Sequence, residues 1–196
     1  MSNKVVLASG NKGKIEEIQS ILQPLAWQVL PQSDFQVEEA EETGLSFVEN
    51  AIIKARNAAA HCNLPAIADD SGLEVDWLKG EPGIYSSRFA GVNATDRQNL
   101  EKLLEQLASV EEVERTARFR CVMVFMRHAK DPSPVIAAGS WEGRILTSPS
   151  GESGFGYDPV FWVPERNCSA AELEKHDKNS LSHRGKALAS LLQKLS

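Results

Sequence analysis

Hydrophobic residues along this chain follow two spacings, one typical of strands and one typical of helices. Apolar runs at residues 4–8 and 64–68 predict buried strands, and the first is expected to be buried on both faces, central and parallel. Residues 27–30 predict a further strand. Every second residue is apolar near 119–125, and residues 135–145 return after a turn, which predicts a long β-hairpin.

Other segments carry apolar residues at intervals of three or four, the spacing of amphipathic helices. The first helix is expected to follow a loop at residues 9–14 and to end with the help of Pro24, its apolar face being Ile15, Ile18, Ile21, Leu22 and Leu25. Ser46 and Glu49 form a capping box for a helix that reaches about Cys62, and residues 95–98 begin another. A last helix is expected from the leucines between 181 and 195.

The remaining segments are irregular. Residues 31–44 predict an acidic loop, residues 80–83 a turn, and residues 148–159 are rich in Gly, Ser and Pro. No internal repeat and no long linker divides the chain. We therefore expect a mixed α/β fold with one antiparallel hairpin, formed as a single domain over residues 1–196.

Composition narrows the classes of function. Of the 196 residues, 42% are hydrophobic and 24% charged, which is ordinary for a soluble globular protein. The net charge of −6 argues against a broad nucleic-acid-binding face, although a local basic pocket stays possible. No apolar run is long enough to span a membrane. The three cysteines lack metal-ligand spacing, so we expect a reduced, cytoplasmic protein.

The most informative stretch is Asp69-Asp70-Ser71-Gly72, directly after the apolar run at 64–68. We expect the strand to end here in a turn at Gly72. Ligands of open α/β sheets gather at the carboxyl ends of strands, so the two carboxylates are candidates for a site. The alternative is that they cap a turn and face water.

The loop after the first strand is a candidate phosphate site. Gly10 and Gly13 allow close approach of an anion, and Lys12 and Lys14 add positive charge at the start of a helix. The loop is not a Walker A motif, because its glycines are too close together and Ile15 replaces the expected Ser or Thr. A simple strand-to-helix turn is the alternative.

A run of acids precedes the second helix, at Glu38, Glu39, Glu41 and Glu42. Such a run is usually a solvated loop, but with Asp69 or Asp70 it offers the oxygen ligands that magnesium prefers. Lys54 is either a surface lysine or a phosphate contact.

Two later segments are candidates for binding a planar ring. Phe155 and Tyr157 lie between glycines and a proline, in a loop where exposed rings could stack on a base. The alternative is a packed turn that covers the core. Lys178, His183 and Arg184 lie near the start of the last helix, where cations gain nothing from the helix dipole. They are expected to hold a base carbonyl or a phosphate.

Taken together, these segments resemble the inosine/xanthosine triphosphate pyrophosphatases, in their bacterial dITP/XTP form. The resemblance covers nearly the whole chain and rests on seven motifs in family order: 9–14 (SGNKGK), 42–44 (ETG), 49–51 with 54–55 (ENA, KA), 68–73 (ADDSGL), 82–86 (PGIYS), 154–159 (GFGYDP) and 182–185 (SHRG). Ser9 stands where the family commonly has Thr, which keeps the hydroxyl.

The resemblance implies an elongated mixed α/β fold with two lobes about a cleft, a homodimer, and magnesium dependence. It also implies hydrolysis of non-canonical purine triphosphates to the monophosphate and pyrophosphate, with Asp70 as proton acceptor. Asp70 and Glu42 would bind Mg²⁺, with Glu41 as a less certain substitute for Glu42. Residues of the first loop and one helix lysine would hold the triphosphate: Ser9, Gly10, Asn11, Lys12, Gly13, Lys14 and Lys54. Contacts with the base and sugar would come from Ser71, Phe155, Gly156, Tyr157, Asp158, Lys178, His183 and Arg184.

Elementary chemistry agrees with these roles. Hypoxanthine and xanthine carry a carbonyl where adenine has an amino group, so Lys, Arg and His donors would favour the keto bases. Two other classes of function stay open at this point. One is a nucleotide-binding regulatory module without turnover, which would not require both Asp70 and Glu42. The other is a magnesium phosphatase or kinase, against which the absence of Asp-x-Asp and Walker A patterns counts.

Overall fold

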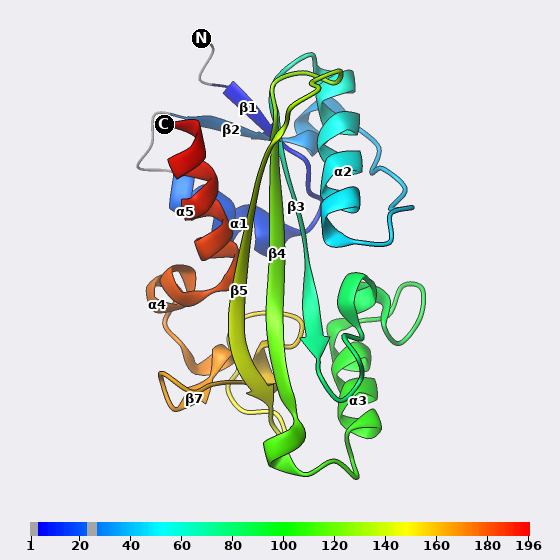
Figure 1. Cartoon of the computed structure of the whole chain (residues 1–196), viewed down its shortest axis with the longest axis vertical. Helices are drawn as coiled ribbons and strands as arrows, with labels where there is room; N and C mark the ends of the chain where they lie inside the picture. The colour runs from blue at the N-terminus through cyan, green and yellow to red at the C-terminus, as the bar shows by residue number, and fades with distance from the viewer. Residues whose placement is uncertain (1–3, 23–26) are drawn as a thin grey trace. The chain divides into compact units, whose positions relative to one another are not determined.

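The computed structural model describes residues 4–22 and 27–196, and the chain forms two compact units (Figure 1). Unit 1 comprises Met1–Asp70, Cys121–Gly139 and His183–Ser196, and unit 2 comprises Ser71–Arg120 and Ser140–Ser182. Both units draw on separate stretches of the chain, so no single sequence boundary divides them. Pro24 and Leu25, expected at the end of the first helix, lie outside the described residues.

The strands form a mixed seven-stranded sheet in the order β2-β1-β3-β4-β5-β6-β7, and helices flank it. In unit 1, β1 (Lys4–Leu7) runs parallel to both β2 (Gln28–Pro31) and β3 (Ala66–Val75). The prediction of a central parallel first strand is confirmed. The long strands β4 (Thr116–Met126) and β5 (Val135–Ile145) are neighbours in the sheet, which confirms the hairpin.

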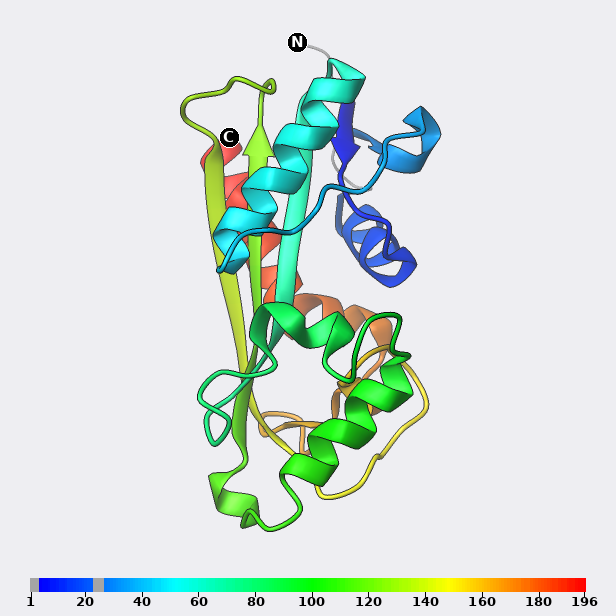
Figure 2. The same cartoon turned by 90° about the vertical axis from the view of Figure 1, so that its right-hand side faces the viewer.

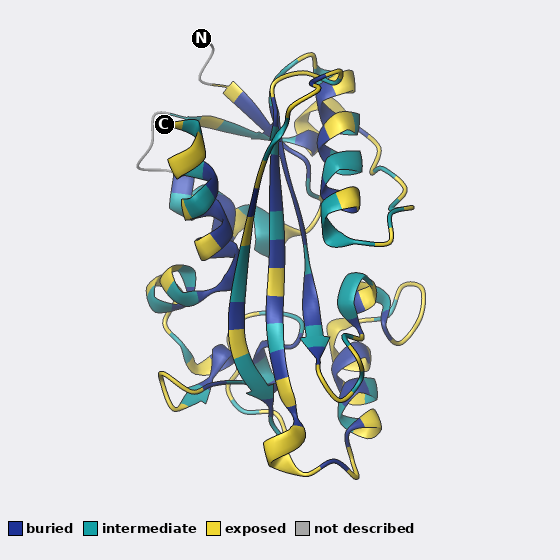
Figure 3. Ribbon diagram, viewed as in Figure 1, coloured by how far each residue is buried: buried dark blue, intermediate teal, exposed yellow. Residues whose placement is uncertain are grey.

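Burial in unit 1 explains why β1 reads as a continuous apolar run. Val5 and Leu7 pack in one hydrophobic cluster with α1 (Lys12–Leu22) and α5 (His183–Leu195). Val6 and Ala8 pack in another cluster with the alanines of α2 (Phe47–Cys62). Successive side chains of a strand point to opposite faces, so helices on both faces require apolar residues at every position. Figures 2 and 3 show α2 opposite α1 and α5, and the buried strands between them.

The capped helices form as the sequence predicts. Ser46 caps α2 by accepting a hydrogen bond from the Glu49 backbone N–H, and Glu49 in turn accepts one from the Leu45 N–H at 3.0 Å. Thr95 and Gln98 form a complete capping box at the start of α3 (Asp96–Gln106). No helix of the described residues is long and apolar enough to cross a membrane.

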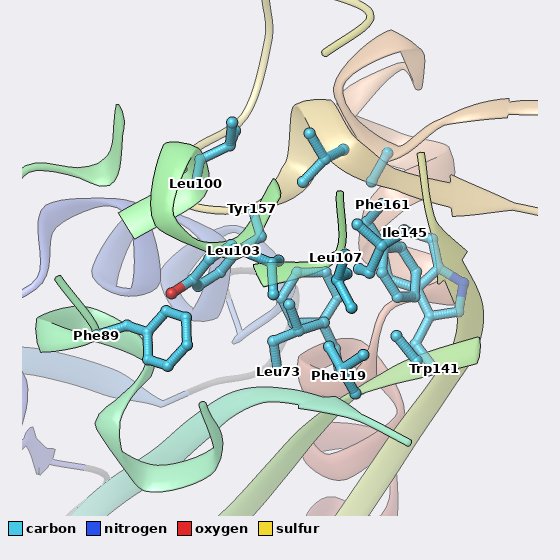
Figure 4. Close-up of a cluster of buried hydrophobic side chains, with 14 of the residues drawn as sticks. Leu73, Phe89, Leu100, Leu103, Leu107, Phe119, Trp141, Ile145, Tyr157 and Phe161 are labelled. Carbon is cyan, nitrogen blue, oxygen red and sulfur yellow. The ribbon is translucent and has the colours of Figure 1, made fainter. Parts of the chain in front are cut away.

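Unit 2 has an aromatic core (Figure 4). Phe161 lies at the centre, with its ring centroid 4.6 Å from that of Phe119 and 5.2 Å from that of Trp141. Phe161 belongs to β6 (Phe161–Val163), which pairs antiparallel with both β5 and β7 (Cys168–Ser169). These two strands are absent from the sequence predictions, because two or three residues are too few to show a period.

Two predicted boundaries are wrong. The loop at residues 9–14 is shorter than expected, because α1 already begins at Lys12. The last helix is two helices, α4 (Lys175–Leu181) and α5, which Ser182 separates in an extended conformation. Lys178 therefore lies within α4 and not just before a single final helix.

The predicted end of β3 is also wrong, since this strand runs through Asp69–Gly72 and ends only at Val75. Gly72 does not form a turn; its lack of a side chain allows another segment of the chain to approach the strand closely. A Cβ at Gly72 would lie 2.2 Å from the Gly83 carbonyl oxygen and 2.6 Å from the Ser86 Oγ. These groups belong to the segment around η2 (Gly83–Arg88), and the Ser86 Oγ accepts a hydrogen bond from the Leu73 N–H at 2.9 Å. The glycine thus lets η2 dock against the strand.

This close approach predicts that Gly72→Ala destabilises the protein. The added methyl meets backbone that cannot move aside, and overpacking of this kind costs about 1–3 kcal/mol of unfolding free energy. Gly10→Ala is the matched control, because its Cβ would meet only the far end of the Glu39 side chain. Urea unfolding of both variants measures the difference. Equal stability of the two variants would contradict this interpretation of Gly72.

Candidate active site

The first strand leads into a helix start that is ordered by its own polar side chains. The Asn11 Oδ1 accepts a hydrogen bond from the Lys14 N–H at 3.1 Å, and the Ser9 Oγ accepts one from the Asn11 N–H at 3.3 Å. Lys12, Gly13 and Lys14 form the first turn of α1. A helix N-terminus with lysines favours anions, so the earlier helix start strengthens the prediction of a phosphate site at 9–14.

Asp69 and Asp70 differ sharply in their surroundings. The Asp69 side chain is fully buried, with its Oδ2 3.2 Å from the Lys14 Nζ and 3.5 Å from the Arg184 Nε. Burial raises the pKa of Asp69, but Lys14, Arg184 and Lys54 together outweigh it and hold that pKa well below its usual range. Asp69 therefore stays ionised and serves as the anion of a buried ion-pair network.

Asp70 is the carboxylate suited to accept a proton. Its Oδ1 accepts a hydrogen bond from the Lys54 Nζ at 2.7 Å, and the same ammonium donates to the Glu42 Oε1 at 3.0 Å. Burial raises the pKa of Asp70 above its usual value, and Lys54 offsets this only in part. For Lys54, burial lowers the pKa, but Asp69, Asp70 and Glu42 raise it overall, so the ammonium stays charged. A raised carboxyl pKa brings Asp70 closer to the range of a general base.

The same two carboxylates fit a magnesium ion. The Asp70 Oδ2 is buried and has no hydrogen-bond partner among the described residues. Magnesium usually takes one or two protein carboxylates together with phosphate oxygens and water. Within residues 4–22 and 27–196, the structure contains no group of three or more His, Cys, Asp or Glu that could hold a metal ion. Glu41 is exposed, and its backbone carbonyl accepts a hydrogen bond from the Thr43 N–H at 3.1 Å.

In unit 2, Asp158 binds both the backbone of the aromatic segment, residues 154–159, and a lysine of α4. The Asp158 Oδ2 accepts hydrogen bonds from the Phe155 N–H at 2.8 Å and from the Lys178 Nζ at 2.7 Å. The Lys178 ammonium also lies 4.9 Å from the centre of the Phe155 ring. Phe155 is half-buried, so it retains a surface on which a planar ring could stack.

Tyr157 corrects the expectation of two exposed rings. It is 5% exposed and belongs to the hydrophobic core of unit 2. Its hydroxyl donates to the Ser86 carbonyl at 2.8 Å, and burial raises the pKa of that hydroxyl. Tyr157 therefore anchors the segment, as the packed-turn alternative predicted for this position. Gly156 is fixed from α3, because its N–H donates to the Asp96 Oδ2 at 2.8 Å.

The three predicted cations near the last helix divide between the units. Lys178 and half-buried Ser71 belong to unit 2, and His183 and Arg184 belong to unit 1. Arg184 is buried and forms ion pairs with Glu17 and Asp69. These carboxylates explain why a cation is tolerated at the start of α5. Whether Arg184 also contacts substrate stays a prediction.

Sequence reasoning missed several residues that shape these contacts, among them Glu17, Ser86 and Asp96. Glu17 had a usable signal, because it follows Lys14 by three positions and so shares its face of α1. The partner of Glu17 is Arg184, which is far away in sequence. Spacing within a helix gives no information about such a pairing.

Comparison with known proteins identifies the family to which this arrangement belongs. A sequence model described as the Ham1 family matches residues 5–194. The chain belongs to the Ham1 family. The resemblance predicted from the motifs is thereby confirmed.

Individual relatives match over nearly their full lengths. The chain is 62% identical over 193 residues to the dITP/XTP pyrophosphatase of Vibrio parahaemolyticus, covering 98% of this chain and 96% of that protein. It is 58% identical to the Vibrio cholerae protein of the same name, with coverage of 97% and 95%. The solved structure of a HAM1 protein from Coxiella burnetii superimposes with a TM-score of 0.91 at 49% identity, and the match covers 98% of each chain.

Proposed function

We propose that this protein hydrolyses non-canonical purine nucleoside triphosphates, such as dITP and XTP, to the monophosphate and pyrophosphate. The observation that carries the proposal is the cluster in which Lys54 joins Asp70 and Glu42, beside the pair of half-buried Lys14 and buried Asp69. The names of the relatives from both Vibrio species support the same activity. Removal of such triphosphates keeps deaminated purines out of the nucleotide pool.

The proposed reaction divides the work among residues of unit 1. The first turn of α1 and Lys54 bind the triphosphate, because backbone amides at a helix start and ammonium groups both attract phosphate oxygens. Asp70 accepts the proton of the water molecule that attacks the α-phosphorus. A metal ion bound by Glu42 and Asp70 would supply charge neutralisation on the phosphates. Lys54 keeps both carboxylates in place until a triphosphate arrives.

We further propose that Phe155 and Lys178 recognise the base. The Phe155 ring offers a stacking surface, and Lys178 offers donors for a keto group at position six of the purine. Asp158 fixes both of these residues at once, through the Phe155 N–H and the Lys178 ammonium. Adenine presents an amino group at that position and would leave such a donor unpaired.

Two further expectations belong to this proposal. The three cysteines are free, which supports a reducing compartment such as the cytoplasm. A homodimer, which the resemblance implies, stays a prediction.

The experiment that tests the function is a panel of purine triphosphates assayed for both pyrophosphate and orthophosphate. We expect pyrophosphate from dITP, ITP and XTP, with much slower release from ATP, and loss of turnover when excess chelator removes Mg²⁺. Binding without turnover would instead identify a regulatory module. Orthophosphate as the product would identify a phosphatase. Full activity in chelator would refute the metal assignment.

A further inference from the structure

The segment that carries Glu42 is tied to α2 at two points. We call residues 38–44 the acid loop. The Glu38 carbonyl accepts a hydrogen bond from the Asn57 Nδ2 at 2.9 Å, and the Gly44 N–H donates to the Asn50 Oδ1 at 2.9 Å. Figure 2 shows the segment that leads into α2 passing alongside that helix. Both ends of the acid loop are therefore held by asparagine side chains of one helix.

The two asparagines share a helix face with Lys54. Residues four and seven positions after a given helical residue lie on the same side as that residue, so Asn50, Lys54 and Asn57 line up along α2. Lys54 binds the Glu42 carboxylate between the two asparagine contacts, at 3.0 Å. Side chain and backbone of the acid loop are thus fixed from the same face.

The contact at Asn50 is rigid. Asn50 is fully buried, and a Cβ at Gly44 would lie 2.5 Å from the Glu49 Cβ and 2.7 Å from the Asn50 Oδ1. Gly44 thus lies too close to α2 for any side chain. The Asn50 Nδ2 is buried and has no hydrogen-bond partner in the part of the chain that the structure describes. An unsatisfied buried donor lowers the stability of the fold. This cost indicates that Asn50 has another role, which is to hold the acid loop.

We propose that Asn50 and Asn57 are positioning residues that hold the acid loop so that Glu42 stays beside Asp70 for metal binding. The inference rests on the proposed function, which places a divalent cation at these two carboxylates. Groups that orient metal ligands typically change metal affinity by roughly 10- to 100-fold when they are removed. Asn50 should have the larger effect, because Asn50 is fully buried and its contact is partly buried, whereas the contact of Asn57 is exposed.

The first test is amide hydrogen exchange at Gly44 in the protein without nucleotide. Asn50→Ala should speed exchange at Gly44 and across the acid loop, because the acceptor of the Gly44 N–H is gone. Asn50→Asp keeps an acceptor oxygen of nearly the same shape and should restore protection. Unchanged exchange in Asn50→Ala, or failure of Asn50→Asp to restore protection, would overturn the anchoring role.

The second test is Mn²⁺ titration of the same variants, followed by electron paramagnetic resonance. We expect roughly tenfold weaker binding in Asn50→Ala, a smaller loss in Asn57→Ala, and near-parent binding in Asn50→Asp. Asn99→Ala is the matched control. Asn99 is also buried and bridges two backbone groups, the Ala90 N–H and the Ser87 carbonyl, but it lies in unit 2. The Asn99→Ala variant should therefore have a lower free energy of unfolding but bind Mn²⁺ as tightly as the parent.

The outcomes separate the inference from the proposed function. Equal loss of Mn²⁺ binding in Asn99→Ala and Asn50→Ala would show that Asn50 acts only by stabilising the fold, and would overturn the inference. Faster loop exchange with unchanged Mn²⁺ affinity would overturn it as well. If Asn50→Ala does not fold, the exposed contact of Asn57 carries the test, and unchanged Mn²⁺ binding in Asn57→Ala counts against it. A parent protein that binds Mn²⁺ but releases no pyrophosphate refutes the proposed function alone.

Discussion

Asp70→Asn should reduce kcat by about 10²- to 10⁴-fold while the protein stays folded. The change is nearly isosteric, but it removes the proposed general base, and a general base typically contributes a factor of that size. It also removes one of the two carboxylates proposed to bind magnesium. Steady-state turnover of dITP measures the loss, and urea unfolding of the same samples checks the fold.

The stability of this variant has its own expected sign. Burial raises the pKa of Asp70, so its ionised form is less stable in the folded protein than in the unfolded chain. A neutral amide removes that penalty, and Lys54 keeps Glu42 as a partner. The free energy of unfolding at neutral pH should therefore be unchanged or higher. Parent-like turnover of Asp70→Asn together with an inactive Asp69→Asn would show that the other carboxylate is the base.

Arg184→Ala should lower the free energy of unfolding by about 3–5 kcal/mol at neutral pH. The substitution removes the buried cation that Glu17 and Asp69 share, although Asp69 keeps Lys14 at 3.2 Å, and removing one partner of a buried ion pair costs about this much. Arg97→Ala is the matched control, because the Arg97 pair with Glu101 is exposed. That variant should show no measurable change in urea unfolding.

The pH dependence of this loss follows from Asp69. Its folded-state pKa is depressed, so the stability that Asp69 contributes is present above the unfolded pKa of about 4 and falls as the pH drops toward the folded value. Without Arg184 that folded pKa rises, and the variant loses less stability in acid than the parent. The difference between the two proteins should narrow below about pH 4. A constant difference across that range would contradict the ion-pair account.

The sequence also predicts that Arg184 reads the base. If so, Arg184→Ala should reduce the ratio of kcat/KM for inosine over adenosine triphosphate. Lys14→Ala should weaken both substrates alike. Since Arg184 supports the fold, only this ratio, and not the absolute rate, separates recognition from stability.

Local patterns in the sequence predicted those elements whose cause is local. The cap of α2 needs only Ser46 and Glu49, and the burial of β1 shows directly in its unbroken apolar run. The alternation predicted near residues 119–125 of β4 holds only in the first part of that range. Near its end, Met123 and Val124 are both fully buried, because helices of unit 1 cover both faces there.

What the sequence could not predict depends on partners that are distant in the chain. The motif at 69–72 suggested a strand end, but β3 continues to Val75, and Gly72 instead makes room for the segment around η2. Asp69 and Asp70 are adjacent and chemically identical, but their ion pairs differ: Asp69 pairs with Lys14 and Arg184, and Asp70 pairs with Lys54. The burial of Tyr157 likewise follows from the Ser86 carbonyl and the core of unit 2, which no local spacing reveals.

The most direct test of the account is hydrolysis of dITP in ¹⁸O-labelled water, with Mg²⁺ present and both products analysed by mass spectrometry. If water activated by Asp70 attacks the α-phosphorus, the label appears in deoxyinosine monophosphate and the released pyrophosphate stays unlabelled. Label in pyrophosphate would show attack at the β-phosphorus, and release of orthophosphate would show cleavage at the terminal phosphate. Either of these two results would contradict the proposed reaction.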